Sequence, residues 1–277
     1  MTALLLVGHG TADESGAAAF LSFMDRVRAR VDVPVAGGFI ELSAPSITEA
    51  VADLVAQGVR RFVAVPVVLA PAGHAKGDIP AALARERDRH PGLSYVYGRP
   101  LWPHPTLLTL LEQRLKAVDG TDSAVVLIGR GSTDPDANAE VVKVGRLLWE
   151  GRGLSFVETG FVSLAWPAVP EALERARLLG AKRVVVLPYF LFPGVLPDRV
   201  GSQARQYAAD SPDIEVRYAG IIGDCDELAD VVLERYHEAL HGDIRMNCDT
   251  CVYRVALPGF EHRVGAPRVP HHHPHDH

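Results

Sequence analysis

Two histidines and a glutamate stand where three expected strands end. His9 follows the apolar run 3–7, Glu41 closes the second expected strand, and His74 follows the apolar run 61–68. Ligands of open parallel sheets bind outside the carboxyl ends of the strands, so we expect these three side chains to face one cleft. Neutral imidazole nitrogens and a carboxylate oxygen suit a divalent ion such as cobalt, nickel, zinc or ferrous iron. The three residues therefore predict a metal site.

A lone loop histidine is more often structural than functional. If the fold itself required these residues, the equivalent positions of the second half would hold the same residue types. The positions equivalent to His9, Glu41 and His74 there hold a different set: Arg130, Ser163 and Leu196. The fold thus tolerates the loss of all three metal-binding residue types. We expect one working site per chain, in the first half.

The two halves are recognised by an internal repeat at an offset of 122 residues. The segment Gly38 to Pro71 aligns without a gap on Gly160 to Pro193, and 12 of the 34 positions are identical. The identical residues include glycines and prolines of turns and strand edges. A repeat of this kind indicates two copies of one structural unit.

Each half alternates short apolar runs with amphipathic helical patterns. Apolar residues of the segment 47–55 recur at i, i+3, i+4, i+7 and i+8, and Gly58 predicts the end of that helix. Alternating strands and helices predict an α/β fold with two tandem, doubly wound parallel sheets. We place the N-terminal domain at 1–119, its repeat at 120–242 and an irregular Cys/His-rich tail at 243–277.

Charge and motifs exclude several classes of function. With 28 basic and 34 acidic residues the net charge is −6, so no general basic field attracts nucleic acid or an anionic membrane. No apolar run is long enough to span a bilayer, and residues 1–7 lack the basic start of a signal peptide, so we expect a cytoplasmic protein. The chain contains no phosphate-binding P-loop, no G-x-G-x-x-G fingerprint and no G-x-S-x-G elbow.

Three segments resemble one family. GHGT at 8–11, GFIELSAPSI at 38–47 and GHAKGDIP at 73–80 are similar to motifs of the class II tetrapyrrole chelatases, the sirohydrochlorin chelatases of the CbiX and SirB type. The long form of this family is an internal duplication. The resemblance implies a lyase that inserts a divalent metal into a tetrapyrrole, with His9 and His74 as catalytic metal-binding histidines and Glu41 as the accompanying carboxylate.

The implied reaction assigns tasks to these residues without deciding which residue performs which task. The metal must be held on one face of the macrocycle, and two pyrrole protons must leave. A neutral histidine serves as ligand or as proton acceptor, and Glu41 accepts or relays a proton. Sirohydrochlorin carries eight carboxylates, so cations at the cleft rim would orient it; we assign this to Arg130 and, second, to Lys76.

The tail carries two further metal-binding patterns. Cys248 and Cys251 form a C-x-x-C pair, which alone supplies half the ligands of a zinc site or an iron–sulfur cluster. In some long CbiX-type chelatases this arrangement is associated with a 4Fe-4S cluster, whose missing ligands here would come from a second chain, Cys225 or His262. The chain is then a monomer or a dimer, with a dimer favoured if the tail shares a cluster. The histidine-rich end, HHHPHDH, is an expression tag or a segment that loosely binds metal.

Three functions remain in competition. The tail resembles that of some long CbiX-type chelatases, and this resemblance favours a sirohydrochlorin cobaltochelatase of cobalamin biosynthesis that uses Co²⁺. Ferrochelatase activity with Fe²⁺ for siroheme is the nearest alternative, and Ni²⁺ is a further metal that such ligands accept. A metal-delivery or storage protein without turnover is the alternative from another class.

Overall fold

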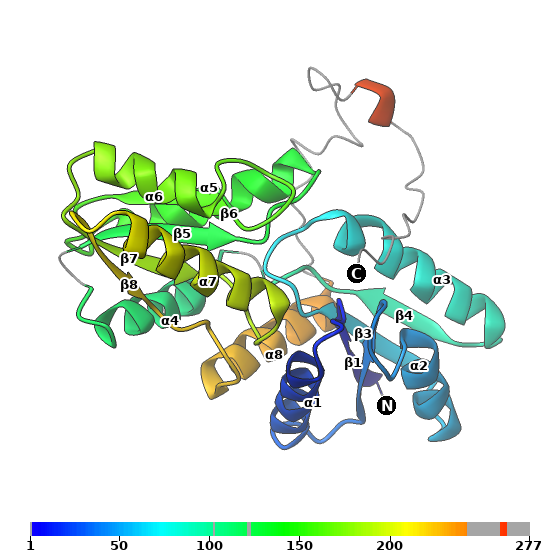
Figure 1. Cartoon of the computed structure of the whole chain (residues 1–277). Coiled ribbons are helices and arrows are strands. Elements are labelled where there is room, and N and C mark those ends of the chain that lie inside the picture. The colour runs from blue at the N-terminus through cyan, green and yellow to red at the C-terminus, as the bar shows by residue number, and fades with distance from the viewer. Residues whose placement is uncertain (1, 102, 121–122, 243–260, 265–277) are drawn as a thin grey trace.

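The computed structural model describes residues 2–101, 103–120, 123–242 and 261–264, which form two four-stranded parallel sheets joined side by side (Figure 1). The strand orders are β2-β1-β3-β4 and β6-β5-β7-β8, the same arrangement twice, as the repeat predicts. The strands of the first sheet are β1 Thr2–Gly8, β2 Val35–Phe39, β3 Arg61–Pro66 and β4 Ser94–Tyr97. Those of the second are β5 Ala124–Gly129, β6 Val157–Phe161, β7 Arg183–Pro188 and β8 Glu215–Tyr218. The predicted α/β class with two tandem parallel sheets is confirmed.

Helices connect the strands. They are α1 Glu14–Arg28, α2 Ile47–Ala56, α3 Ile79–Arg89, α4 Pro105–Lys116, α5 Pro135–Trp149, α6 Val169–Leu178, α7 Val195–Asp210 and α8 Asp226–His241. The start of α2 is fixed by a capping box between Ser46 and Glu49. Gly58, the residue after the C-cap of α2, has a φ of 83° and prevents the helix from continuing. Ile47, Val51 and Leu54 are buried on the helix face that the periodicity predicts. No described helix is long and apolar enough to cross a membrane.

Alternate residues of the central strands belong to different cores. Leu4 and Leu6 of β1 face a large core, to which Val125 and Leu127 of β5 also contribute, so this core joins the two halves. The intervening residues of each strand face a smaller core of their own half: Ala3, Leu5 and Val7 in the first, Ala124, Val126 and Ile128 in the second. Burial on both faces explains why these strands are apolar throughout rather than alternating.

The last helix of each half packs against the other half (Figure 1). Helix α4 contacts β7 and α5, whereas α8 returns to contact β3, β4 and α1. The boundary predicted after residue 119 stays a prediction, and the packing of α4 and α8 crosses it. Because each half packs its last helix against the other half, the carboxyl ends of the strands of both sheets face the same space.

Candidate metal site

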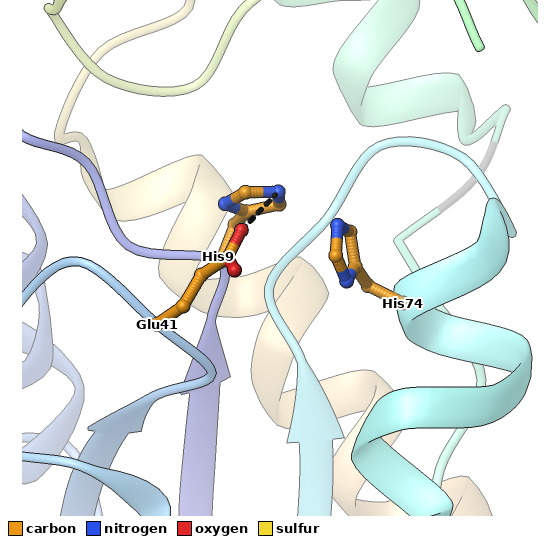
Figure 2. A group of neighbouring side chains, drawn as sticks. All are labelled: His9, Glu41 and His74. Carbon is orange, nitrogen blue, oxygen red and sulfur yellow. Dashed lines mark ion pairs between the residues drawn. The ribbon is translucent and has the colours of Figure 1, made fainter. Parts of the chain in front are cut away.

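His9, Glu41 and His74 lie together, as their positions after β1, β2 and β3 predict. Each offers a ligand atom, and these atoms all lie within 4.8 Å of one another. His9 Nε2 lies 3.7 Å from Glu41 Oε1, and the centroids of the two imidazole rings are 4.3 Å apart at an interplanar angle of 84°. Figure 2 shows the His74 ring facing the pair formed by His9 and Glu41. Two imidazoles and one carboxylate so grouped could together hold a divalent ion.

The parallel register brings His9 and Glu41 side by side. Gly8 pairs with Phe39, and beyond that pair the Glu41 amide donates to the His9 carbonyl at 3.2 Å. Gly10 has a φ of 93°, and a Cβ there would lie 1.7 Å from the Glu41 carbonyl oxygen. Only glycine permits this approach, so Gly10 is needed for the spacing of the two ligands.

His74 begins a π-helical turn, His74–Asp78, that leads into α3. Its Nδ1 lies 2.6 Å from Asp78 Oδ2, and both side chains are only 11% exposed. A carboxylate on one ring nitrogen fixes the orientation of the imidazole, so a metal would bind at Nε2. Asp78 was not among the residues predicted from the sequence, although its i, i+4 spacing from His74 could have revealed it.

Burial controls the protonation of His74. It lowers the pKa of the imidazole below its ordinary value, Arg130 lowers it further, and Asp78 and Glu41 oppose both effects. The net direction is downward, so the neutral form predominates at pH 7. A neutral imidazole is the form that binds a metal or accepts a proton.

Arg130, the counterpart of His9, lines the same cleft from the second half. Burial lowers the pKa of the guanidinium and the charge of Glu41 raises it, but an arginine remains charged at pH 7. The positive charge of Arg130 also lowers the pKa of His74. The cleft therefore has donors for a metal on one wall and a fixed cation on the other.

Lys76 does not lie at the cleft rim, where it was predicted to orient a substrate. Its side chain is 8% exposed, and Nζ lies 2.8 Å from both Asp134 Oδ2 and Asp136 Oδ2 at the start of α5. These ion pairs raise the pKa of Lys76, against the effect of burial. Lys76 therefore connects the turn that carries His74 to the second half, which the sequence could not show because the contact depends on how the halves pack.

The cleft between the halves has a volume of about 640 Å³ and an apolar lining. Its walls include Phe20, Val67 and Leu69 from the first half and Phe190, Leu191 and Phe192 from the second. A large apolar cleft with a few polar groups is typical of a site for a small organic molecule rather than for a metal ion alone.

Both halves match the same family. The model of the CbiX family matches residues 3–118 and again residues 124–239. The chain belongs to the CbiX family. This CbiX chain is similar to a sirohydrochlorin cobaltochelatase of Priestia megaterium. The two are 39% identical over 264 residues, which cover 93% of this chain and 86% of that protein.

A sirohydrochlorin ferrochelatase of the same organism is 32% identical to this CbiX chain over 237 residues, covering 84% of it and 88% of the relative. Among solved structures, the sirohydrochlorin chelatase SirB of Bacillus subtilis subspecies spizizenii in complex with cobalt has a TM-score of 0.76 at 29% identity, covering 87% of this chain and 97% of that one.

Among the described residues, the histidines and the cysteine other than His9 and His74 do not line the cleft. His104 caps α4, accepting from the Thr106 amide at 3.1 Å. Cys225 is the N-cap residue of α8 and packs partly buried against the shared core, and burial raises the pKa of its thiol. The predicted cluster ligands Cys248 and Cys251 lie outside the described residues.

Proposed function

We propose that this chain is a metal-inserting lyase, a sirohydrochlorin cobaltochelatase of cobalamin biosynthesis. The observation that supports it most is the grouping of His9, Glu41 and His74 beside a cleft, lined by the two histidines, that is large enough for more than an ion. The two Priestia megaterium relatives act, by their names, on sirohydrochlorin. The more similar of them is the cobaltochelatase.

In the proposed reaction, Co²⁺ enters the ring as two pyrrole N–H protons leave. His9, Glu41 and His74 hold the ion on the first-half wall, and Asp78 keeps the His74 ring in place. The His9 and His74 imidazoles and the Glu41 carboxylate are the candidate proton acceptors, each through an atom that is not bound to the ion at that moment.

Ligand chemistry alone would not select cobalt, because nickel binds more tightly than cobalt, and cobalt more tightly than ferrous iron, at most nitrogen and oxygen sites. The test is a comparison of initial insertion rates into sirohydrochlorin with Co²⁺, Fe²⁺ and Ni²⁺ in the absence of oxygen. We expect the highest rate with Co²⁺. A higher rate with Fe²⁺ would assign the chain to siroheme synthesis instead.

Arg130 is proposed to bind a carboxylate of the macrocycle. Replacing Arg130 by leucine should raise the KM for sirohydrochlorin by about tenfold to a hundredfold, because a hydrogen bond to a charged group contributes about 1.5–3 kcal/mol. Cobalt affinity should not fall, since the change removes a cation near the ligands. Steady-state kinetics with each substrate varied in turn measures both effects.

The matched control for Arg130 is Arg146→Leu, because Arg146 lies on the exposed face of α5. That variant should retain the KM of the unaltered chain. An unchanged KM for sirohydrochlorin in Arg130→Leu would remove Arg130 from the substrate site.

The tail is proposed to hold a 4Fe-4S cluster through Cys248 and Cys251. Two cysteines are half of the ligands that such a cluster needs, so the others would come from a second chain, from Cys225 or from His262. Anaerobically purified protein should contain iron and sulfide and should be a dimer if two chains share the cluster. Colourless, iron-free protein would exclude the cluster.

A further inference from the structure

Leu42 and Leu164 occupy the same position in the two halves and share a rare backbone conformation. Their φ angles are 64° and 60°, in the left-handed region that leucine seldom adopts. Each is the centre of a γ-turn: the Ser43 amide donates to the Glu41 carbonyl at 2.8 Å, and the Ala165 amide donates to the Ser163 carbonyl at 2.7 Å. A γ-turn with positive φ is strained, and such strain concentrates at functional sites.

Both turns are wedged against a glycine of the neighbouring loop. A Cβ at Gly131 would lie 1.8 Å from the Ser163 carbonyl oxygen, matching the contact of Gly10 with Glu41 in the first half. The leucine side chains are left 49% and 58% exposed for Leu42 and Leu164, respectively. Both line the cleft. The strained turns therefore present two large apolar side chains at equivalent places on opposite halves.

The contrast between the halves separates two tasks. The metal-binding residues of the first half have no counterparts of the same type in the second, yet the turn, its leucine and its glycine are present in both. A feature retained where the metal ligands are absent has a task beyond the metal site. It suits a ligand large enough to touch both halves, and a cleft of about 640 Å³ can hold part of a macrocycle.

We propose that Leu42 and Leu164 form an apolar clamp that holds the tetrapyrrole ring from both halves, while the first half alone handles the metal. The clamp rests on the proposed function. Leu42 directly follows Glu41, so the first-half contact places the ring beside the metal ligands, and Leu164 closes on it from the wall that carries Arg130. When the substrate binds, the side chains of both leucines lose their contact with water and pack against carbon atoms of the tetrapyrrole ring.

Glycine substitutions separate binding from folding. Leu42→Gly and Leu164→Gly keep a residue that adopts positive φ readily, so each variant should unfold at the same or a higher temperature than the unaltered chain. Each should bind metal-free sirohydrochlorin about tenfold more weakly, because one apolar contact is lost. Absorbance titration of the full chain with metal-free sirohydrochlorin measures this, and cobalt binding should not change.

Alanine substitutions provide the matched comparison. Leu42→Ala and Leu164→Ala should weaken sirohydrochlorin binding as the glycine variants do, whereas Leu178→Ala should not, since Leu178 is 72% exposed at the end of α6 and does not line the cleft. If the unaltered chain fails to bind sirohydrochlorin, the proposed function fails. If it binds and the leucine variants bind equally well, or lose affinity only in proportion to lost thermal stability, the clamp is wrong.

Discussion

Replacing His74 by alanine is expected to reduce cobalt insertion into sirohydrochlorin at least about a hundredfold, because the site loses both a metal ligand and a potential proton acceptor. The variant should still fold. Asp78 loses its contact with His74 Nδ1, and losing a hydrogen-bond partner in the interior costs at most about 1–3 kcal/mol, less than the roughly 5–15 kcal/mol that stabilises a typical domain. Insertion rates and circular dichroism of the same preparation measure the two effects.

His237→Ala is the control for the His74 prediction. His237 lies exposed on α8, outside the cleft, so its loss removes an imidazole from the chain without touching the site. Its insertion rate should match that of the unaltered protein. Normal turnover in His74→Ala would show that the chemistry occurs elsewhere.

Replacing Lys76 by methionine is expected to destabilise the chain by about 3–5 kcal/mol, the range found when one partner of a buried ion pair is removed. The two carboxylates that it contacts, Asp134 and Asp136, are nearly inaccessible to solvent and would lose their cation. Because Lys76 also connects the His74 turn to the second half, the affinity for cobalt should fall as well. Urea denaturation and a cobalt titration measure these effects.

Lys116→Met is the matched control, because Lys116 makes an exposed pair with Glu112 at 2.7 Å on α4. Exposed pairs contribute about 0–1 kcal/mol, so this variant should retain nearly full stability. A Lys76→Met protein as stable as Lys116→Met would contradict the structural role assigned to the buried pairs.

The fold class and the three clustered residues could be predicted because both depend on local pattern. Apolar runs, helix periodicity and the repeat define the parallel sheets, and a parallel sheet gathers the loops after its strands at one edge. The positions of His9, Glu41 and His74 after successive strands were therefore sufficient to bring them together.

Contacts between the halves could not be predicted. Helices α4 and α8 have apolar faces that would fit either sheet, so their exchange is not visible in their periodicity. Lys76 was predicted to orient the carboxylates of the substrate, but its partners Asp134 and Asp136 come from the other half. The left-handed leucines were equally hidden, since nothing in the residue type signals a positive φ.

Catalytic turnover is decided by the yield of metal insertion when sirohydrochlorin and Co²⁺ are both in large excess over the protein. We expect the absorbance of the free macrocycle to be replaced by that of the cobalt complex many times per chain, well above the rate without protein. Tight binding of cobalt without such turnover would contradict this expectation and identify a metal-delivery or storage protein.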